Sequence, residues 1–195
     1  MSLILASNSQ IRRSMLRAAG IEFEVRPPDI DESALKALLT DNRPAEVARA
    51  LAVSKAVDVS RSAGSDWVIG SDSIVSVNGE RFNKPANRDE AAEHLQRFSS
   101  NLMQLTSAVA LARSGNPQWT HAETATLQVR ELSDAFIQDY LDAEWPAVGY
   151  CVGVFRMEGR GVTLFECVEG SHFTILGMPL LPLLGALRER ELIPA

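Results

Sequence analysis

The chain has 195 residues, of which 46% are hydrophobic and 23% charged, and its formal net charge is −6. This length is enough for one sizeable hydrophobic core, and the negative charge disfavours a nucleic-acid or anionic-membrane partner. Cys151 and Cys167 are too far apart for a CxxC pair, and no stretch resembles a signal peptide or reaches membrane-spanning length. We therefore expect a cytoplasmic protein with reduced thiols.

The first predicted elements are a buried strand and a capped helix. Leu3–Ala6 is an apolar run typical of a buried strand, and Ser9 can cap a helix over Gln10–Ala19. Hydroxyl and guanidinium side chains gather at this junction: Ser7, Ser9, Arg12 and Arg13. Together with the unpaired N–H groups of a helix start, they predict an anion site, most naturally for phosphate.

The rest of the chain alternates predicted strands and helices. The strands are Ile21–Arg26, Trp67–Val77, Leu102–Arg113, Thr120–Leu132 and Val162–Val168. The helices are Ala34–Leu39, Pro44 to about Arg61, Asp89–Phe98, a segment capped by Ser133 that ends at Glu144, and Met178–Glu191. Asn78-Gly79 is a strong hairpin signal. The order predicts an α/β fold with a mixed sheet, as one domain over residues 1–195 with two lobes around a cleft.

The segment Gly70-Ser71-Asp72-Ser73 interrupts an apolar strand with three polar side chains. Buried unpaired polar groups are costly, so a central strand would carry them only for a use. An edge strand whose polar residues face water explains them equally well, and the spacing alone does not separate the two.

Two lysines are candidates for a charged cleft. Lys55 shares its predicted helix face with Leu51 and Ala52, so its ammonium group either snorkels to water or meets a buried partner. Lys84 follows the predicted hairpin and returns toward Asp72 if that hairpin forms, although most lysines are solvated surface residues.

An acidic cluster precedes the first long helix, at Asp29, Asp31 and Glu32. Such clusters can bind hard cations, but they are more often solvated. P-loop, GxGxxG, HExxH and GxSxG patterns do not occur, which removes the commonest kinase, dehydrogenase, zinc-protease and hydrolase interpretations.

Several motifs are spread along the chain: Leu3-Ile4-Leu5-Ala6-Ser7-x-Ser9-x-x-Arg12-Arg13, Asp31-Glu32-Ser33, Lys55-Ala56, Gly70-Ser71-Asp72-Ser73, Lys84-Pro85, Asp89-Glu90-Ala91, Glu158-Gly159-x-Gly161, Glu169-Gly170-Ser171 and Leu176-Gly177-Met178-Pro179-Leu180. In this order they closely resemble the Maf family of nucleoside triphosphate pyrophosphatases. The resemblance implies a fold like that of the inosine triphosphatases, and hydrolysis between the α and β phosphates with a divalent cation, Mg²⁺ or Mn²⁺. It also suggests a homodimer.

The resemblance implies roles for individual residues. Asp72 would be the proton acceptor that activates water, with Lys84 as a second catalytic residue. The phosphate-binding residues would be Ser7, Ser9, Arg12, Arg13 and Lys55. Glu32 would join Asp72 near the metal.

Glu158 indicates the substrate base. The chain resembles the 7-methyl-GTP subgroup in having Gly-Ser-Asp at residues 70–72 and Glu-Gly at residues 158–159. At the position of Glu158, the subgroups acting on thymidine and uridine triphosphates carry glutamine. A carboxylate can accept hydrogen bonds from both N1–H and the exocyclic amine of guanine, and methylation at N7 adds positive charge that favours an anion. We expect Glu158 to select 7-methylguanine, with Ile11 and Ser73 shaping its pocket.

Two alternatives remain open. The same reaction could act on dTTP, UTP or other modified nucleotides, against which Glu158 argues. The chain could instead be a non-catalytic nucleotide-binding regulator of cell division, because the family name is tied to inhibition of septum formation. A pure binder needs no general base, so Asp72 argues against that second alternative.

Overall fold

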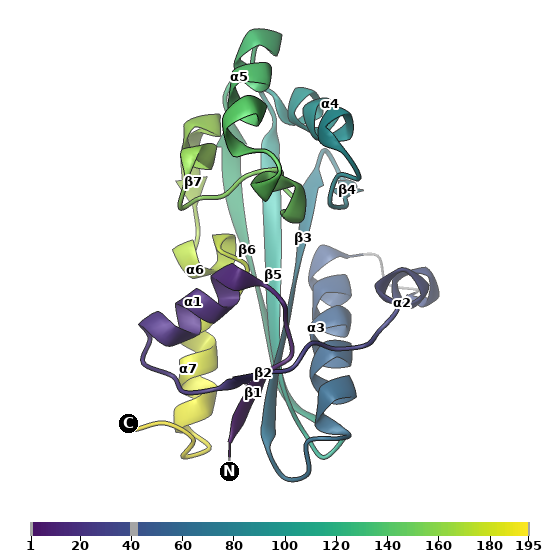
Figure 1. The fold of residues 1–195 in the computed structure, drawn as a ribbon, viewed down its shortest axis with the longest axis vertical. Helices are drawn as coiled ribbons and strands as arrows, with labels where there is room; N and C mark the ends of the chain where they lie inside the picture. The colour runs from purple at the N-terminus through teal and green to yellow at the C-terminus, as the bar shows by residue number, and fades with distance from the viewer. Residues whose placement is uncertain (1, 40–42, 195) are drawn as a thin grey trace. The chain divides into compact units, whose positions relative to one another are not determined.

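The computed structural model describes residues 2–39 and 43–194. The described residues form a seven-stranded sheet in the order β2-β1-β3-β5-β6-β7, with β4 added to β3 (Figure 1). The strands are β1 Leu3–Leu5, β2 Glu24–Val25, β3 Trp67–Val77, β4 Glu80–Phe82, β5 Leu102–Arg113, β6 Asn116–Val129 and β7 Phe165–Glu169. β1 pairs in parallel with β2 and β3, whereas β3–β4 and β6–β7 are antiparallel, so the predicted mixed sheet is confirmed.

Seven α-helices and two 3₁₀ helices accompany the sheet in the described part of the chain. The α-helices are α1 Gln10–Ala18, α2 Glu32–Leu38, α3 Pro44–Ser60, α4 Arg88–Phe98, α5 Asp134–Glu144, α6 His172–Ile175 and α7 Leu180–Arg188. The 3₁₀ helices are η1 Ala147–Tyr150 and η2 Arg160–Leu164. The α/β class predicted from the sequence is therefore confirmed.

The chain divides into two compact units made of interleaved segments. The first unit comprises Met1–Ser73, Thr106–Glu123 and Ser171–Ala195, and the second comprises Ile74–Leu105 and Thr124–Gly170. The long strands β3, β5 and β6 contribute residues to both units. That the whole of residues 1–195 acts as one domain stays a prediction.

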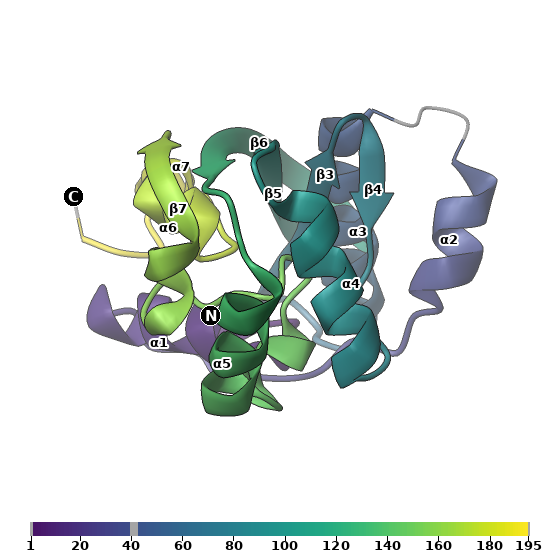
Figure 2. The same ribbon diagram turned by 90° about the horizontal axis from the view of Figure 1, so that it is seen from above.

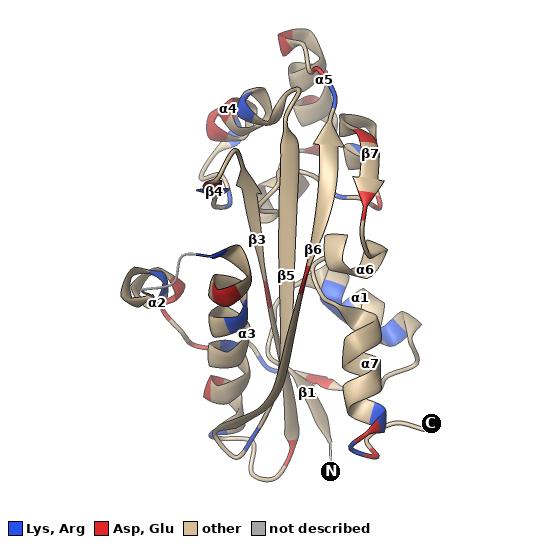
Figure 3. Cartoon of the chain, turned by 180° about the vertical axis from the view of Figure 1, so that it is seen from behind, with Lys and Arg blue, Asp and Glu red and all other residues tan. Residues whose placement is uncertain are grey.

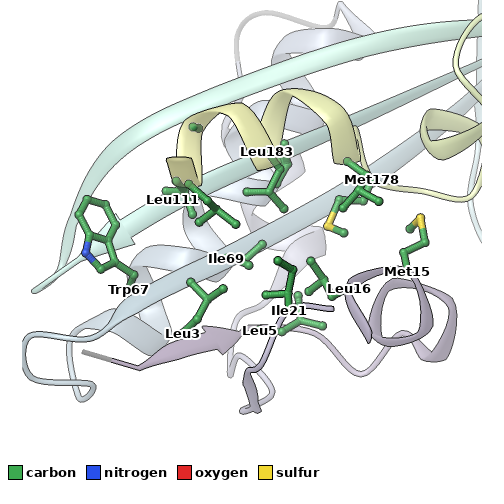
Figure 4. Close-up of a cluster of buried hydrophobic side chains, with 14 residues drawn as sticks. Leu3, Leu5, Met15, Leu16, Ile21, Trp67, Ile69, Leu111, Met178 and Leu183 are labelled. Carbon is green, nitrogen blue, oxygen red and sulfur yellow. The ribbon is translucent and has the colours of Figure 1, made fainter. Parts of the chain in front are cut away.

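In the first unit, the side chains of β3 alternate between two layers of helices. Ile69 belongs to a buried cluster with Leu16 of α1 and Leu183 of α7 (Figure 4). Successive strand residues point to opposite faces, and Gly70 accordingly faces α3. Figure 1 shows α3 on one side of these strands and α1 with α7 on the other. Asp72 lies two residues after Gly70, on the same face of β3, and therefore points toward α3.

Helix α3 approaches β3 at backbone distance. A Cβ atom added to Gly70 would lie 2.1 Å from the carbonyl oxygen of Ala52 and 2.7 Å from the nitrogen of Ala56. Both alanines are completely buried, and their small side chains permit this approach. Because Lys55 precedes Ala56, the contact brings its side chain to the part of β3 that carries Asp72.

The second unit is built around a hairpin and two neighbouring helices. Asn78 and Gly79 adopt φ values of 52° and 80°, as the predicted β3–β4 turn requires. The ring of Phe82 packs edge-on against Phe98 at 4.7 Å and against His94 at 5.1 Å, between ring centroids. Helices α4 and α5 lie side by side above this hairpin (Figures 1 and 2).

Three predicted strands differ from the structure. The predicted strand Ile21–Arg26 is reduced to β2, because Ile21 packs into the first unit's core cluster. The predicted start of β6 at Thr120 is too late, since the preceding turn is confined to Ser114 and Gly115, with φ values of 51° and 77°.

The first half of the predicted strand Val162–Val168 is wrong. Val162 lies in η2, where the hydroxyl of Thr163 donates to the carbonyl of Arg160 over 2.7 Å. The short helix α6 was not predicted. Helix α7 begins two residues later than Met178, because Pro179 precedes its first turn, and ends at Arg188, three residues before the predicted end at Glu191. The other predicted elements are confirmed to within about two residues.

Candidate active site

An ion-pair triad, buried at Lys55 and Asp72 and partly exposed at Glu32, lies between α2, α3 and β3 of the first unit. The ammonium nitrogen of Lys55 is 2.5 Å from Oδ1 of Asp72 and 2.8 Å from Oε1 of Glu32. Lys55 and Asp72 are only 8% and 7% exposed. Of the two explanations left open for Lys55, a buried partner is therefore the correct one. Ser71 is likewise buried, Ser73 is half-buried, and β3 lies between β1 and β5, so an exposed edge strand does not explain Asp72.

The acidic cluster separates into different roles. Asp31 caps α2, since its Oδ1 accepts from the N–H of Ala34 over 2.9 Å. The backbone N–H of Asp29 donates to Oδ2 of Asp58. Glu32 is the member of the cluster that reaches Lys55, so only this carboxylate joins the triad.

The β1–α1 junction has the predicted cap. Ser9 caps α1 by accepting from the N–H of Arg12 over 3.5 Å, and the hydroxyl of Ser7 accepts from the N–H of Ser9 over 3.1 Å. Arg13 donates from Nη2 to the carbonyl of Asn8 over 3.3 Å, and its buried Nε has no hydrogen-bond partner among the described residues. A helix start beside an unpaired guanidinium donor suits an anion.

Arg12 has a use that its sequence context does not indicate. Its Nε donates to the carbonyl of Gly177 over 2.9 Å, its Nη1 to the carbonyl of Ser71 over 2.8 Å, and its Nη2 to the hydroxyl of Ser73 over 3.1 Å. Three of the five N–H donors of a guanidinium group are thus engaged, which leaves two for a ligand. Arg12 therefore holds β3 and the segment at Gly177 together, and it also offers positive charge to a ligand.

The bond from Arg12 to Ser71 takes the place of a missing sheet rung. The last rung between β1 and β3 runs from the N–H of Ala6 to the carbonyl of Ile69. The next carbonyl on that edge of β3 belongs to Ser71, two residues on, and the guanidinium of Arg12 occupies it. Burial lowers the pKa of Arg12, while Asp72 and Glu32 raise it, so this cation shares the electrostatic environment of the triad.

A chain of hydroxyl groups extends from Arg12, and the sequence did not indicate it. Ser107 donates its only hydroxyl hydrogen to the carbonyl of Thr174 over 2.8 Å. The hydroxyl of Ser73 accepts from Arg12 and can donate either to Ser107 at 2.8 Å or to the carbonyl of Gly177 at 3.2 Å. The hydroxyl of Thr174 continues to Oε2 of Glu123 over 2.6 Å. The one available signal was the pair Thr106-Ser107, which interrupts the otherwise apolar stretch from Leu105 to Ala112 of β5.

The remaining predicted residues lie partly in the second unit. Lys84 and Glu158 belong to that unit, and both are exposed. Burial and then Glu158 raise the pKa of the Cys151 thiol to about 11, while Lys84 lowers it. Both charges therefore act on the same thiol. Ile11, in the first turn of α1, is half-buried.

The first-unit residues offer chemical groups that suit an anion and a cation. Lys and Arg residues lie on α1 and α3, the helices that carry Arg13 and Lys55 (Figure 3). Asp72 and Glu32 supply two oxygen ligands that already converge on one positive charge. Mg²⁺ is commonly held by one or two carboxylates completed by water and substrate phosphates, so this donor set fits it. The described residues hold no cluster of three or more His, Cys, Asp or Glu side chains suited to a metal.

The sequence profile of Maf-like proteins matches residues 2–190. The chain belongs to the Maf family. This confirms the resemblance inferred from the separated motifs. Two similar Maf relatives are the 7-methyl-GTP pyrophosphatase of Rhizobium meliloti (strain 1021), 46% identical over 99% of this chain and 98% of its own, and the nucleoside triphosphate pyrophosphatase of Sphingopyxis alaskensis, 44% identical over the whole of both chains.

A solved structure, that of the Staphylococcus aureus Ham1 protein, is similar to this Maf chain with a TM-score of 0.45 and 18% identity, covering 98% of this chain and all of the other. Within residues 2–39 and 43–194 of the Maf chain, none of the helices has both the length and the apolar character needed to cross a bilayer.

Proposed function

We propose that this Maf protein is a cytoplasmic pyrophosphatase that hydrolyses 7-methyl-GTP to 7-methyl-GMP and pyrophosphate, clearing a modified nucleotide. The observation that carries the proposal is the ion-pair triad, in which the buried Asp72 is held by the buried Lys55 beside Glu32. The relatives with matching names cover almost the whole chain at 46% and 43% identity. The resemblance further leads us to propose a homodimer.

In the proposed reaction, Asp72 accepts a proton from the water that attacks the α-phosphorus. The new bond joins that water oxygen to phosphorus, and the bond to the oxygen bridging the α and β phosphates breaks, so pyrophosphate leaves. Lys55 keeps the Asp72 carboxylate in place and adds positive charge beside the reacting phosphates. Such fixed charge is usually the largest contribution to phosphoryl-transfer catalysis.

The other phosphate-binding residues are proposed in the same way. Ser7, Ser9 and the unpaired Nε of Arg13 lie at the start of α1, where oriented N–H groups favour an anion. Arg12 offers its two remaining N–H donors. Lys84, in the second unit, adds a further charge for the departing phosphates.

A divalent cation is part of the proposal, with Asp72 and Glu32 as its protein ligands. When bound, Mg²⁺ or Mn²⁺ supplies Lewis-acid stabilisation of the phosphates and acidifies a coordinated water. The two carboxylates that now share Lys55 are the oxygen donors that such an ion prefers.

The base selectivity is proposed to come from Glu158, whose side chain is exposed and free to meet a ligand. A second candidate keeps the reaction but widens the substrate to dTTP, UTP or other modified nucleotides. It is favoured by the Sphingopyxis alaskensis relative, which is named a nucleoside triphosphate pyrophosphatase without a stated base.

Pyrophosphate release from 7-methyl-GTP, GTP, dTTP and UTP tests both candidates. We expect a preference for 7-methyl-GTP, and we expect Asp72→Asn to lower kcat by about 10²–10⁴-fold. Nucleotide binding should survive in Asp72→Asn, because Lys55 retains Glu32 as a partner. The matched control is Asp142→Asn, which removes an exposed carboxylate that pairs with Arg88.

The outcomes separate the alternatives. Equal turnover of all four nucleotides would favour the broader substrate range. Binding without turnover by the parent protein would favour the regulator of cell division. If Glu158→Gln leaves the kcat/KM ratio of 7-methyl-GTP to UTP unchanged, this glutamate does not select the base.

A further inference from the structure

Two carboxylates are buried among the described residues, and the proposed reaction uses only one of them. They are Asp72 and Glu144, each 7% exposed. Glu144 is the last residue of α5 in the second unit. A buried carboxylate is costly unless charged partners and hydrogen bonds compensate it, so its partners show what it holds in place.

Glu144 forms hydrogen bonds with the segment that follows η1. Its Oε2 accepts from both Nε and Nη2 of Arg156, over 3.2 Å and 2.9 Å, and its Oε1 faces the backbone N–H of Arg160 at 3.4 Å. The hydrogen bond to Glu144 is the main reason why the pKa of Arg156 is raised above its ordinary value. One carboxylate therefore ties together two positions four residues apart.

The loop folds tightly over this ion pair. The N–H of Gly159 donates back to the carbonyl of Arg156 over 3.1 Å, which closes a turn. A Cβ atom on Gly159 would lie 3.4 Å from Nη2 of Arg156 and 3.5 Å from each carboxylate oxygen of Glu144. A Cβ atom on Gly161 would lie only 2.5 Å from the carbonyl of Arg156. Gly159 thus packs against the ion pair and Gly161 against the backbone of Arg156, so the chain just after Glu158 has no room for a larger residue at Gly161.

A second side chain of α5 holds the same loop. Tyr140 lies one turn before Glu144, is 1% exposed, and donates its hydroxyl to the carbonyl of Val154 over 3.0 Å. Val154 has a φ of 55°, which is rare for a β-branched residue and needs support from its surroundings. One face of α5 therefore holds the loop immediately before Glu158 as well as after it.

We infer that Glu144 and Arg156 are positioning residues that fix Glu158 for base selection. Glu158 stands at the tip of the turn they define, two residues after Arg156 and two before Arg160. Exposed glutamate side chains are mobile, and ordering one on binding weakens affinity. A backbone already fixed by a buried carboxylate reduces that loss for the substrate that Glu158 recognises. This inference rests on the proposed role of Glu158.

Stability alone does not account for the ion pair, because replacing a buried ion pair by apolar residues is often neutral or stabilising. Half of this pair also remains near solvent, since the Arg156 side chain is 38% exposed. The pair spans the loop that carries Glu158, whereas a stabilising device could join any two elements of the unit.

The test is a double-mutant cycle with two conservative variants. Glu144→Gln keeps the shape but can accept at only one side-chain atom, and Arg156→Lys keeps the charge but loses the two-pronged contact. Each is combined with Glu158→Gln, and kcat and KM are measured for 7-methyl-GTP and UTP. Glu80→Gln, which removes the exposed ion pair with Arg97 in the same unit, is the control.

We expect each positioning variant to lower the kcat/KM preference for 7-methyl-GTP roughly five- to tenfold, mainly through KM. In the Glu158→Gln background the same variant should leave the preference unchanged, since Arg156 and Glu144 act through Glu158. Hydrogen exchange, a readout that needs no substrate, should show faster exchange in residues 157–161 of Glu144→Gln. The Glu80→Gln control should change neither measurement.

Three results would overturn the inference. They are an unchanged preference in both variants, an equal loss in the parent and Glu158→Gln backgrounds, or unchanged exchange of residues 157–161. The proposed function fails differently: the parent does not prefer 7-methyl-GTP, or Glu158→Gln alone has no effect. In that case the exchange measurement still decides whether Glu144 orders the loop, and the selectivity role of the pair is lost with that of Glu158.

Discussion

Gly70→Ala tests whether the close approach of α3 to β3 sets the geometry of the triad. The added Cβ would lie 2.1 Å from the carbonyl oxygen of Ala52, where real Cβ contacts stay above 3.0 Å. The obstructing atoms are backbone, so no side chain can rotate away and α3 must move by about 1 Å. Overpacking of this kind costs about 3 kcal/mol or more of unfolding free energy. We expect activity to suffer as well, since the displaced helix carries Lys55.

Two measurements check this expectation. Urea unfolding should show a lower midpoint for Gly70→Ala with an unchanged slope, and pyrophosphate release should fall by up to about 10²-fold, the loss that a 1 Å misplacement can cause. The control is Gly185→Ala in α7, where an added Cβ meets no atom within 4 Å. That variant should gain up to about 1 kcal/mol, because alanine favours a helix more than glycine does.

Either of two results would refute the reasoning. If Gly70→Ala unfolds at the parental urea concentration, α3 does not lie against β3 at backbone distance. If it is destabilised but keeps full turnover, the 2.5 Å contact between Lys55 and Asp72 does not depend on this approach.

Two further predictions concern titratable groups of the second unit. Burial lowers the pKa of His94 in the folded state below its ordinary value, so its contribution to stability is present above about pH 6.5 and is lost as the pH falls through the folded pKa. The melting temperature of the parent should therefore drop more between about pH 7.5 and 5.5 than that of His94→Phe, and parallel curves would contradict this. Glu158 raises and Lys84 lowers the pKa of Cys151, which is about 11, so alkylation of this thiol near pH 9 should accelerate in Glu158→Gln and slow in Lys84→Met. The same direction of change in both variants would show that they act through structure rather than charge.

The elements that the sequence predicts well are those with local causes. Ser9 accepts from a backbone N–H three residues on, Asn78-Gly79 closes its own turn, and the apolar run of β3 ends where its turn begins. The first half of the predicted strand Val162–Val168 was wrong because the local β pattern competes there with η2, which follows the loop held by Arg156 and Glu144. Glu144 lies in α5, so the sequence around Val162 does not contain the residue that contacts Arg160 at the start of η2.

The candidate site follows the same rule. The residue types of Asp72 and Glu32 indicated chemistry, but the sequence left open whether they were buried or solvated, because their shared partner comes from a third segment.

Arg12 shows most clearly why residue type alone does not settle a role. A guanidinium group at a helix start predicts anion binding, and two of its donors remain available for that purpose. Its other donors reach a carbonyl 165 residues away and the edge of β3, where they continue a sheet that β1 leaves unfinished. The same positive charge shares the electrostatic environment of Asp72 and Glu32. Removing Arg12 would therefore withdraw charge from the site and loosen the strand that carries Asp72, so loss of activity in such a variant could not by itself be assigned to phosphate binding.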